Sequence, residues 1–297
     1  MKILILGGGQ DAFILSYLFF KKYNIRTSIA VRNLSNNSIM NWANVFECGS
    51  FIDNSDSIFN LIKEIKPDYI VNTAALSSSK ECKKSPDLVY EINSYFPIKL
   101  IKFLSGNNSK LIHFGSILEK ENRPNCIYTK SKIIASNFIN NCNQNSLVEN
   151  LCLPNHESPL RDTRFFIREL ISTFEPAINS PKNYKIQINL NNGNTFRYWS
   201  WAPTLLGEIA EMIYKNEFNN DFEKFTTKLN LIQFTASVSK IFDIKEISIN
   251  CHKSGNYKLE DIFLPNINKP TANWIKKLFT TKFESRFNLN TWCEEIK

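Results

Sequence analysis

The segment KILILGGGQDA at residues 2–12 decides the fold. It begins with a short apolar run typical of a buried strand, and the residues after the turn have a helical pattern. In the GxGxxA spacing, Gly7 allows a tight turn, Gly9 lets a pyrophosphate approach the backbone, and Ala12 lets the helix pack closely. A helix N-terminus at this point attracts negative charge. We therefore predict a dinucleotide site that comprises Gly7, Gly9, Gln10, Asp11 and Ala12; an ordinary glycine-rich turn is the alternative.

The rest of the first half alternates β-branched runs with helical apolar spacing, which is typical of a parallel sheet covered by helices. Further strands are predicted at residues 26–31, 68–72, 110–114 and 147–152. This pattern predicts an α/β fold, a Rossmann-type doubly wound parallel sheet. We assign the cofactor domain to residues 1–153, with a returning segment near 195–215. The alternation ends after residue 154, so residues 154–297 are predicted to form a smaller C-terminal α/β substrate-binding lobe.

Composition excludes several functional classes. The 297 residues are 43% hydrophobic, which is enough for one large core or two adjoining ones. No apolar run reaches the roughly 20 residues of a membrane-spanning helix, and no secretory signal is recognisable, so we expect a cytoplasmic protein without membrane contact. The net charge of +8 is spread along the chain, which argues against a nucleic-acid partner. The seven cysteines form no metal-ligand pattern, so we expect free thiols and no metal site.

The end of the second predicted strand bears on the choice of cofactor. An acidic residue at this position commonly binds the ribose 2′-hydroxyl of NAD, but Arg32 follows the strand instead. A guanidinium favours a 2′-phosphate, so we predict NADP, with NAD as the alternative if Arg32 is only a solvated surface residue.

A second motif indicates proton-transfer chemistry. Tyr128 and Lys132 are four residues apart, so a helix places both on one face. A nearby ammonium stabilises a phenolate and makes the tyrosine a useful acid/base. A packed tyrosine beside a solvated lysine would show the same spacing. Ser116, however, lies just after predicted strand 110–114, where its hydroxyl would face a nicotinamide.

These motifs, together with the Asn72–Ala75 turn after strand 68–72, resemble the extended short-chain dehydrogenase/reductase superfamily. Two later segments narrow the resemblance to the GDP-mannose 4,6-dehydratase family. The sequence NHESP occurs at residues 155–159, and RYWSWA at 197–202 resembles the RDWGHA segment of that family. The family's GQDG turn corresponds to residues 9–12.

The resemblance implies an NADP-dependent enzyme that oxidises a nucleotide sugar, expected to be GDP-linked, at C4 and then eliminates water. It implies that Ser116, Tyr128 and Lys132 activate the C4 hydroxyl. The implied cofactor contacts also include Arg32, Asn72, Ala74, Ala75, Tyr128 and Lys132, and the candidate substrate contacts are Asn155, Arg168, Arg197, Lys258 and Arg286. A homodimer is implied, paired through helices near residues 86–105 and 128–143.

The sequence also departs from that family. The dehydratases carry a glutamate two residues after the catalytic hydroxyl, where it removes the C5 proton, whereas this chain has Leu118 there and Glu119 next. If Glu119 replaces that base, dehydration follows. If it does not, the chain is a 4-keto-sugar reductase or epimerase. Loss of catalysis, leaving a nucleotide-sugar binding protein, is a third alternative.

Overall fold

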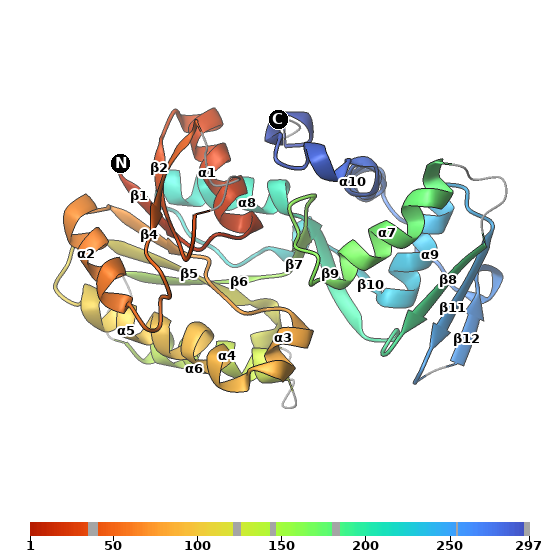
Figure 1. The fold of residues 1–297 in the computed structure, drawn as a ribbon, viewed down its shortest axis with the longest axis horizontal. Coiled ribbons are helices and arrows are strands. Elements are labelled where there is room, and N and C mark those ends of the chain that lie inside the picture. The colour runs from red at the N-terminus through yellow and green to blue at the C-terminus, as the bar shows by residue number, and fades with distance from the viewer. Residues whose placement is uncertain (35–40, 121–125, 143–146, 180–184, 254, 294–297) are drawn as a thin grey trace. The chain divides into compact units, whose positions relative to one another are not determined.

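The computed structural model describes residues 1–34, 41–120, 126–142, 147–179, 185–253 and 255–293 (Figure 1). Its contacts divide the chain into two units. The first comprises Met1–Leu153 and Leu205–Phe222, and the second comprises Pro154–Thr204 and Glu223–Glu295. The predicted Rossmann-type α/β fold is confirmed, because the first unit contains a six-stranded parallel sheet with the order β3-β2-β1-β4-β5-β6.

The strands of this sheet are β1 (Ile3–Leu6), β2 (Thr27–Val31), β3 (Ala43–Glu47), β4 (Tyr69–Asn72), β5 (Lys110–Ser116) and β6 (Val148–Leu153). All four residues of β1 are buried, as expected of a central parallel strand covered on both faces. The sequence analysis missed β3, an edge strand whose residues are mostly half-buried or exposed and therefore lack a continuous apolar run.

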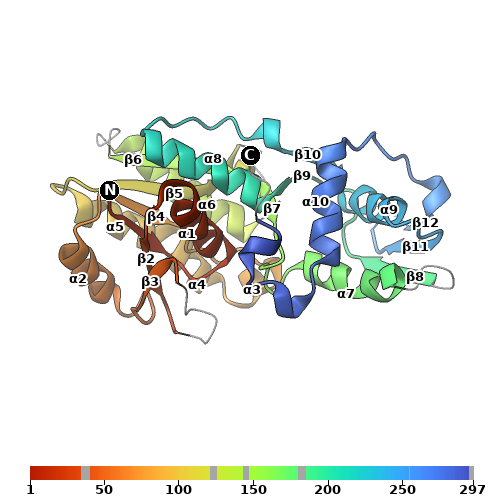
Figure 2. The same ribbon diagram turned by 90° about the horizontal axis from the view of Figure 1, so that it is seen from above.

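Helices cover both faces of the sheet (Figures 1 and 2). Those of this unit are α1 (Gln10–Tyr23), α2 (Ser55–Ile65), α3 (Ser79–Lys84), α4 (Pro86–Tyr90), η2 (Glu91–Tyr95), α5 (Phe96–Leu104), η3 (Ile117–Glu119), α6 (Ile127–Asn141) and α8 (Ala202–Lys215). Helices α1 and α8 lie on one face, where the rings of Tyr23 and Tyr214 stack at 4.2 Å. Helices α2, α5 and α6 cover the other face.

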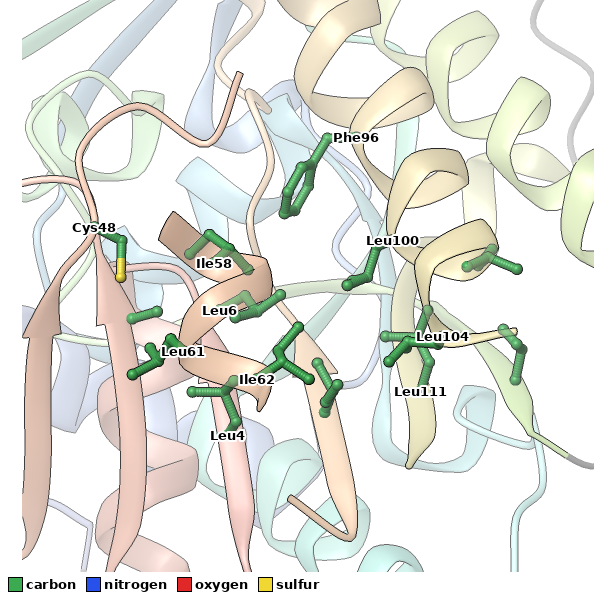
Figure 3. Close-up of a cluster of buried hydrophobic side chains, with 14 of the residues drawn as sticks. Leu4, Leu6, Cys48, Ile58, Leu61, Ile62, Phe96, Leu100, Leu104 and Leu111 are labelled. Carbon is green, nitrogen blue, oxygen red and sulfur yellow. The ribbon is translucent and has the colours of Figure 1, made fainter. Parts of the chain in front are cut away.

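One buried hydrophobic cluster of the first unit lies between the sheet and helices α2, α5 and α6 (Figure 3). Leu4 and Leu6 from β1 are fully buried there, together with Ile58 from α2 and Leu100 from α5. Burial of each such side chain contributes about 1.5–3 kcal/mol. This packing fixes β1, and β1 leads directly into the glycine turn.

A π-helical turn, η2, interrupts the long helical stretch between residues 86 and 104. Its cause is Pro97, which has no N–H to donate and whose ring would collide with the carbonyl of Asn93 in a regular α-helix. The N–H of Phe96 bonds to Glu91 O instead. The widened turn holds the fully buried side chain of Asn93.

The second unit has two three-stranded sheets, with orders β10-β9-β7 and β12-β11-β8. Its elements are β7 (Asn155–Glu157), α7 (Phe166–Asn179), β8 (Lys185–Leu190), β9 (Phe196–Trp201), η5 (Glu223–Phe225), β10 (Thr227–Asn230), α9 (Leu231–Ile241), β11 (Glu246–Cys251), β12 (Gly255–Lys258), η6 (Leu259–Asp261), α10 (Lys269–Thr280), η7 (Phe283–Ser285) and η8 (Leu289–Thr291). Aromatic side chains form much of its core: Trp199 stacks on Phe234 at 4.3 Å, and Trp201 stacks near Trp274 at 6.3 Å. Within the described ranges, no helix is long and apolar enough to cross a membrane.

Candidate active site

The turn between β1 and α1 is shaped to receive a phosphate group. Gly9 is the N-cap of α1, and among the described residues no side chain caps this helix end or lies within 4 Å of a Cβ built on Gly9. Gly7 has φ +127°, and a Cβ there would lie 2.6 Å from Thr73 Oγ1, so glycine is required. Ala12 is buried in the first turn of α1, which begins with Gln10 and Asp11. An open helix N-terminus fits the pyrophosphate of NAD or NADP.

The end of β4 forms the neighbouring wall of this turn. Thr73 donates both its N–H and its hydroxyl to Leu6 O, at 3.0 and 2.9 Å, which joins the two strand ends. Asn72 is buried, and its Oδ1 accepts the N–H of Ala74 at 3.3 Å. Ala74 is half-buried and Ala75 is exposed. The Asn72–Ala75 segment therefore lies beside the glycine turn, and its contact with a cofactor stays a prediction.

The end of β2 carries opposite charges. Arg32 follows β2 directly and is exposed, so its contact with a 2′-phosphate stays a prediction. Glu47 closes the adjacent strand β3, in register with Val31, and its Oε2 accepts the N–H of Leu34 at 3.1 Å. The sequence analysis considered only the residues that follow β2, and it therefore missed this carboxylate. Its sequence signal, an acid that ends a short strand, becomes visible only once β3 is recognised.

The proposed catalytic residues come from the end of β5 and from α6. Ser116 is the last residue of β5 and is buried. Tyr128 and Lys132 lie one turn apart on α6, and the Nζ of Lys132 donates to the carbonyl oxygen of Phe114 at 2.6 Å. Tyr128 is half-buried. The structure thus brings Lys132 to the strand that carries Ser116.

Lys132 is an electrostatically unusual lysine. Its side chain is buried, and this burial lowers its pKa to about 8, although Glu119, Asp11 and Cys152 oppose the shift. His113 lies nearby on β5, where burial and then the charge of Lys132 lower its pKa well below the ordinary value. Asn72 Nδ2 lies 3.2 Å from His113 Nδ1, so a neutral imidazole accepts this hydrogen bond. His113 is therefore a neutral core residue.

Asn93 was not among the predicted site residues. Its Oδ1 accepts the N–H of Leu76 and its Nδ2 donates to Leu76 O, each at 2.9 Å. The same Nδ2 donates to Ser131 Oγ at 3.0 Å, and that hydroxyl donates to Tyr128 O at 2.7 Å. Asn93 therefore links the loop after β4 to the helical turn of Tyr128. Its signal in the sequence is Pro97, four residues later, which forces the π-helical turn.

Glu119 lies beneath the end of β5 and bonds to the protein through both carboxylate oxygens. Oε1 accepts the N–H of Ser116 at 2.6 Å, and Oε2 accepts from Asn150 Nδ2 at 3.3 Å and from the thiol of Cys152 at 3.6 Å. Burial, followed by the charge of Glu119, raises the pKa of Cys152 to about 12, so this thiol stays protonated. Residues 121–125 of the short loop that leads to Tyr128 lie outside the described residues.

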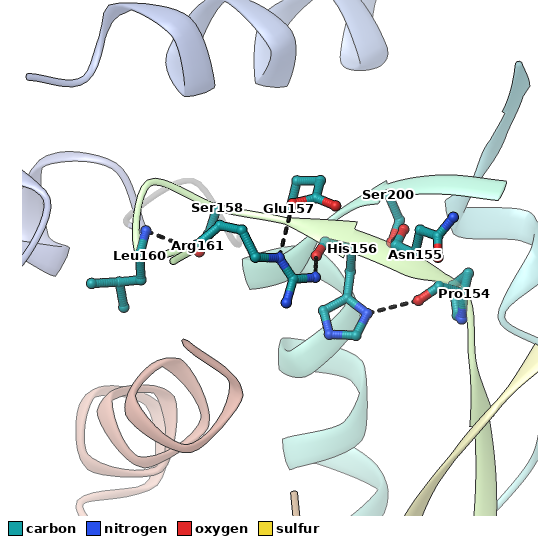
Figure 4. Close-up of polar contacts among 8 residues, drawn as sticks. All are labelled: Pro154, Asn155, His156, Glu157, Ser158, Leu160, Arg161 and Ser200. Carbon is teal, nitrogen blue, oxygen red and sulfur yellow. Dashed lines mark hydrogen bonds and ion pairs between the residues drawn. The ribbon is translucent and has the colours of Figure 1, made fainter. Parts of the chain in front are cut away.

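In the second unit, the NHESP segment is held by its own side chains (Figure 4). His156 Nδ1 lies 2.7 Å from Pro154 O. Arg161 donates to Glu157 Oε2 at 3.0 Å and to His156 O at 2.6 Å, and Glu157 is buried. His156 and Glu157 therefore stabilise the segment, which begins with the half-buried Asn155.

Two of the predicted substrate residues are electrostatically coupled to each other. Burial lowers the pKa of Arg168, on α7. Burial and then repulsion by Arg168 lower the pKa of Arg286, while Asp162 opposes this shift. Glu175 opposes the shift at Arg168, so each of the two guanidiniums already has an acidic group near it. That these two side chains bind the diphosphate of a substrate stays a prediction.

The remaining predicted substrate residues lie elsewhere in this unit. Arg197, on β9, lies 6.0 Å from the ring of Trp199, and Trp199 is part of the aromatic core. Lys258 lies on β12, an edge strand of the other sheet, where its exposed ammonium is 3.9 Å from Glu260. The contact of Lys258 with a substrate stays a prediction.

A strand–glycine turn–helix cradle and a Tyr–Lys pair beside a strand-end serine define an extended short-chain dehydrogenase/reductase. The model of the GDP-mannose 4,6 dehydratase family matches residues 4–260, so the chain belongs to this family. No curated protein matches the chain.

Solved structures share the fold at low sequence identity. L-threonine dehydrogenase from Clostridium difficile has a TM-score of 0.67 and 14% identity, with 97% of this chain and 96% of that chain covered. UDP-glucose 4-epimerase from Thermus thermophilus, a complex with NAD, has a TM-score of 0.64 and 13% identity, with 97% of each chain covered. UDP-N-acetylglucosamine 4-epimerase from Methanobrevibacter ruminantium, in complex with UDP-N-acetylmuramic acid, has a TM-score of 0.65 and 17% identity, with 94% of this chain and 98% of that chain covered.

Proposed function

We propose that the protein transfers hydride at C4 of a nucleotide sugar, with Tyr128 as the acid/base. The observation that carries this proposal is Lys132, a buried ammonium one helical turn from Tyr128 and bonded to the strand of Ser116. A bound nicotinamide would accept the hydride that C4 releases. Tyr128, as phenolate, takes the hydroxyl proton, so that the alcohol becomes a ketone. The positive charge of Lys132 stabilises the phenolate, and Ser116 orients the sugar hydroxyl.

We propose that the substrate is GDP-linked, a proposal supported by the family to which the chain belongs. Arg168 and Arg286 supply positive charge for the diphosphate, because burial depresses the pKa of both guanidiniums and a bound anion would offset that cost. Arg197 is proposed to assist them, and Asn155 is proposed to contact the sugar. The two 4-epimerases with the same fold are named for UDP-sugars, which favours a nucleoside diphosphate sugar of some kind.

We propose NADP as the cofactor because Arg32 follows β2 and offers a guanidinium to a 2′-phosphate. Glu47 works in the opposite direction, since a carboxylate favours a 2′-hydroxyl and repels a phosphate. The balance between these two side chains sets the preference for NADP over NAD.

The hydrogen bonds of Glu119 favour a reaction that oxidises or reduces the sugar without eliminating water. Elimination requires a base that removes the C5 proton, and the position used by the family holds Leu118. Glu119 is next in the chain, but both of its oxygens already accept hydrogen bonds. The family match favours the second candidate function, 4,6-dehydration, in which Glu119 must leave these partners to act as the base.

We also propose that the protein forms a homodimer. Leu88 on α4, Tyr95 on η2 and Ile134 on α6 are 40%, 47% and 38% exposed. Elements α4 and η2 both pack against α6, so these apolar side chains belong to one helical layer. A second copy would bury them.

Incubation with GDP-mannose and oxidised NADP, followed by mass spectrometry, tests the function. A product with unchanged mass or lighter by two hydrogens supports C4 redox chemistry, provided that the sugar is altered. A product lighter by one water supports dehydration. No change in any GDP- or UDP-linked sugar, with either cofactor, would contradict both functions.

A further inference from the structure

We infer that Glu119 is a positioning residue: with Gly115 and Asn150 it fixes the strand end that carries Ser116, and it does not act as a base. This inference rests on the proposed function, in which Ser116 orients the sugar hydroxyl. It goes further because it gives the Glu119 carboxylate, on the η3 turn, the role of holding Ser116 in place.

Ser116 and Glu119 cap each other across η3. The N–H of Ser116 donates to Glu119 Oε1 at 2.6 Å, and Ser116 Oγ accepts the N–H of Leu118 at 3.3 Å. This reciprocal arrangement satisfies two donors that the strand end would otherwise leave open. It also occupies one acceptor position of Ser116 Oγ, so that the hydroxyl proton is left for another acceptor.

The second oxygen of Glu119 is anchored to β6. Asn150 Nδ2 donates to Oε2 at 3.3 Å and to Ser136 Oγ on α6 at 3.0 Å. The strand itself is clamped by Asn220, whose Oδ1 accepts the N–H of Cys152 at 2.9 Å and whose Nδ2 donates to Asn150 O at 3.0 Å. A continuous series of hydrogen bonds therefore runs from the segment after α8, through β6 and Glu119, to Ser116.

Gly115 provides the space for this carboxylate. A Cβ built on Gly115 would lie 2.8 Å from Glu119 Oε1 and 2.5 Å from Asn150 Oδ1. Both distances are shorter than van der Waals contact, so any larger residue displaces the two side chains. The small residue before Ser116 and the acid after it thus form one structural unit.

Paired substitutions separate positioning from base catalysis. Glu119→Gln keeps an oxygen that accepts the Ser116 N–H but removes the basic group. Rotation of the Asn150 amide would then present its Oδ1, a buried atom without a partner in the described structure, to the new amide. Glu119→Leu removes the acceptor and leaves a buried donor unpaired. Glu64, an exposed residue of α2, supplies matched control variants Glu64→Gln and Glu64→Leu.

The expected result is that Glu119→Gln turns over within about 5-fold of the wild type, while Glu119→Leu and Gly115→Ala lose about 100-fold through misplacement of Ser116. If Glu119→Gln were as inactive as Glu119→Leu and accumulated a 4-keto sugar that retains its water, Glu119 would be the base and the inference would be overturned.

The pH profile gives a second readout. Lys132 is faced by Glu119 of η3, Asp11 of α1, Cys152 of β6 and His113 of β5, and it shares α6 with Tyr128. Loss of the negative charge of Glu119 lowers the pKa of Lys132. The limb of the pH–rate profile that reports the titration of Lys132 therefore moves to lower pH in Glu119→Gln, with little loss of maximal rate. An unmoved limb together with a collapsed rate would contradict the inference.

Amide hydrogen exchange tests the inference even if the proposed function fails. Tyr128→Phe and the incubations with nucleotide sugars test only the proposed function, and they do not test the role of Glu119. In exchange measurements, the Ser116 amide is expected to exchange at least about 10-fold faster in Glu119→Leu than in Glu119→Gln, because the first variant has lost the acceptor. Equal exchange in the two variants would overturn the positioning role, whatever the enzyme assays show.

Discussion

The Nζ of Lys132 donates to the main-chain oxygen of Phe114 at 2.6 Å, two residues before Ser116. The bond fastens α6, which carries Tyr128, to the end of β5. This buried contact therefore fixes the ammonium of Lys132, one helical turn from Tyr128, against the strand that ends in Ser116.

Replacement of Tyr128 by phenylalanine removes only the phenol oxygen. We expect turnover to fall about 10²–10⁴-fold, because the acid/base is lost, while cofactor binding stays within a small factor of the wild type. Turnover and fluorescence titration of the reduced cofactor measure the two effects. Tyr69→Phe, at the start of β4, is the matched control and is expected to leave turnover unchanged. Undiminished turnover in Tyr128→Phe would exclude this residue as the acid/base.

Lys132 makes stability depend on pH. Its pKa is lowered from 10.5 to about 8, so between these values the unfolded chain binds a proton that the folded protein has released. Stability relative to Lys132→Met is therefore expected to rise with pH across this window, by about 3 kcal/mol at most. Denaturant unfolding of both proteins from neutral to strongly alkaline pH measures the difference. A constant difference would show that Lys132 titrates normally.

Two glycines of the first turn are expected to respond differently. Gly7→Ala is strained at φ +127° and collides with Thr73, so it should destabilise the fold by about 1–3 kcal/mol. Gly9→Val meets open space in the described structure and should leave the melting temperature nearly unchanged while abolishing dinucleotide binding. Thermal unfolding and cofactor titration distinguish the two effects. Cofactor binding at wild-type strength in Gly9→Val would place the dinucleotide elsewhere.

Arg32 and Glu47 are expected to shift cofactor preference in opposite directions. Arg32→Ala should lower the ratio of NADP to NAD affinity by at least about 10-fold, because a charge-assisted contact with the 2′-phosphate is lost. Glu47→Gln should raise the same ratio. Dissociation constants for both cofactors, measured with each variant, provide the test. Unchanged ratios in both variants would remove these side chains from the ribose site.

The ion pair of Glu157 and Arg161 is mostly buried, with side-chain exposures of 8% and 15%. Glu157→Gln leaves the guanidinium without its counter-charge and is expected to destabilise the protein by about 3 kcal/mol. Asp162→Asn, which affects the half-exposed pair with Arg164, serves as the control and should cost less than about 1 kcal/mol. Denaturant unfolding measures the loss of unfolding free energy in each variant. Equal losses would show that the Glu157–Arg161 pair stabilises the protein no more than the half-exposed pair.

Local patterns predicted the centre of the sheet well. The run before Gly7 is buried on both sides and is therefore uniformly apolar, and the Tyr128–Lys132 spacing lies on one helix as expected. Strand β8 was not predicted, because it alternates exposed polar and buried apolar residues and has no continuous apolar run. The edge strand β3, and with it Glu47, was missed for a similar reason.

Long-range partners were beyond the reach of such patterns. The sequence places Glu119 next to Leu118 and suggests a shifted base, but its partner Asn150 is 31 residues away and on another strand. The role of Asn93 likewise depends on its hydrogen bond to Ser131, 38 residues later in the chain. Residues that act through contacts across the fold carry no local signature, whereas residues fixed by a turn or a helix face do.

The side-chain amide of Asn220 also closes the outer side of β6 by imitating the peptide group of a further strand. An open margin of a sheet is a template on which other chains can add and grow into fibres. We therefore expect Asn220 to limit the addition of other strands to β6, and a substitution that removes its amide to reduce the yield of soluble protein before it changes any rate.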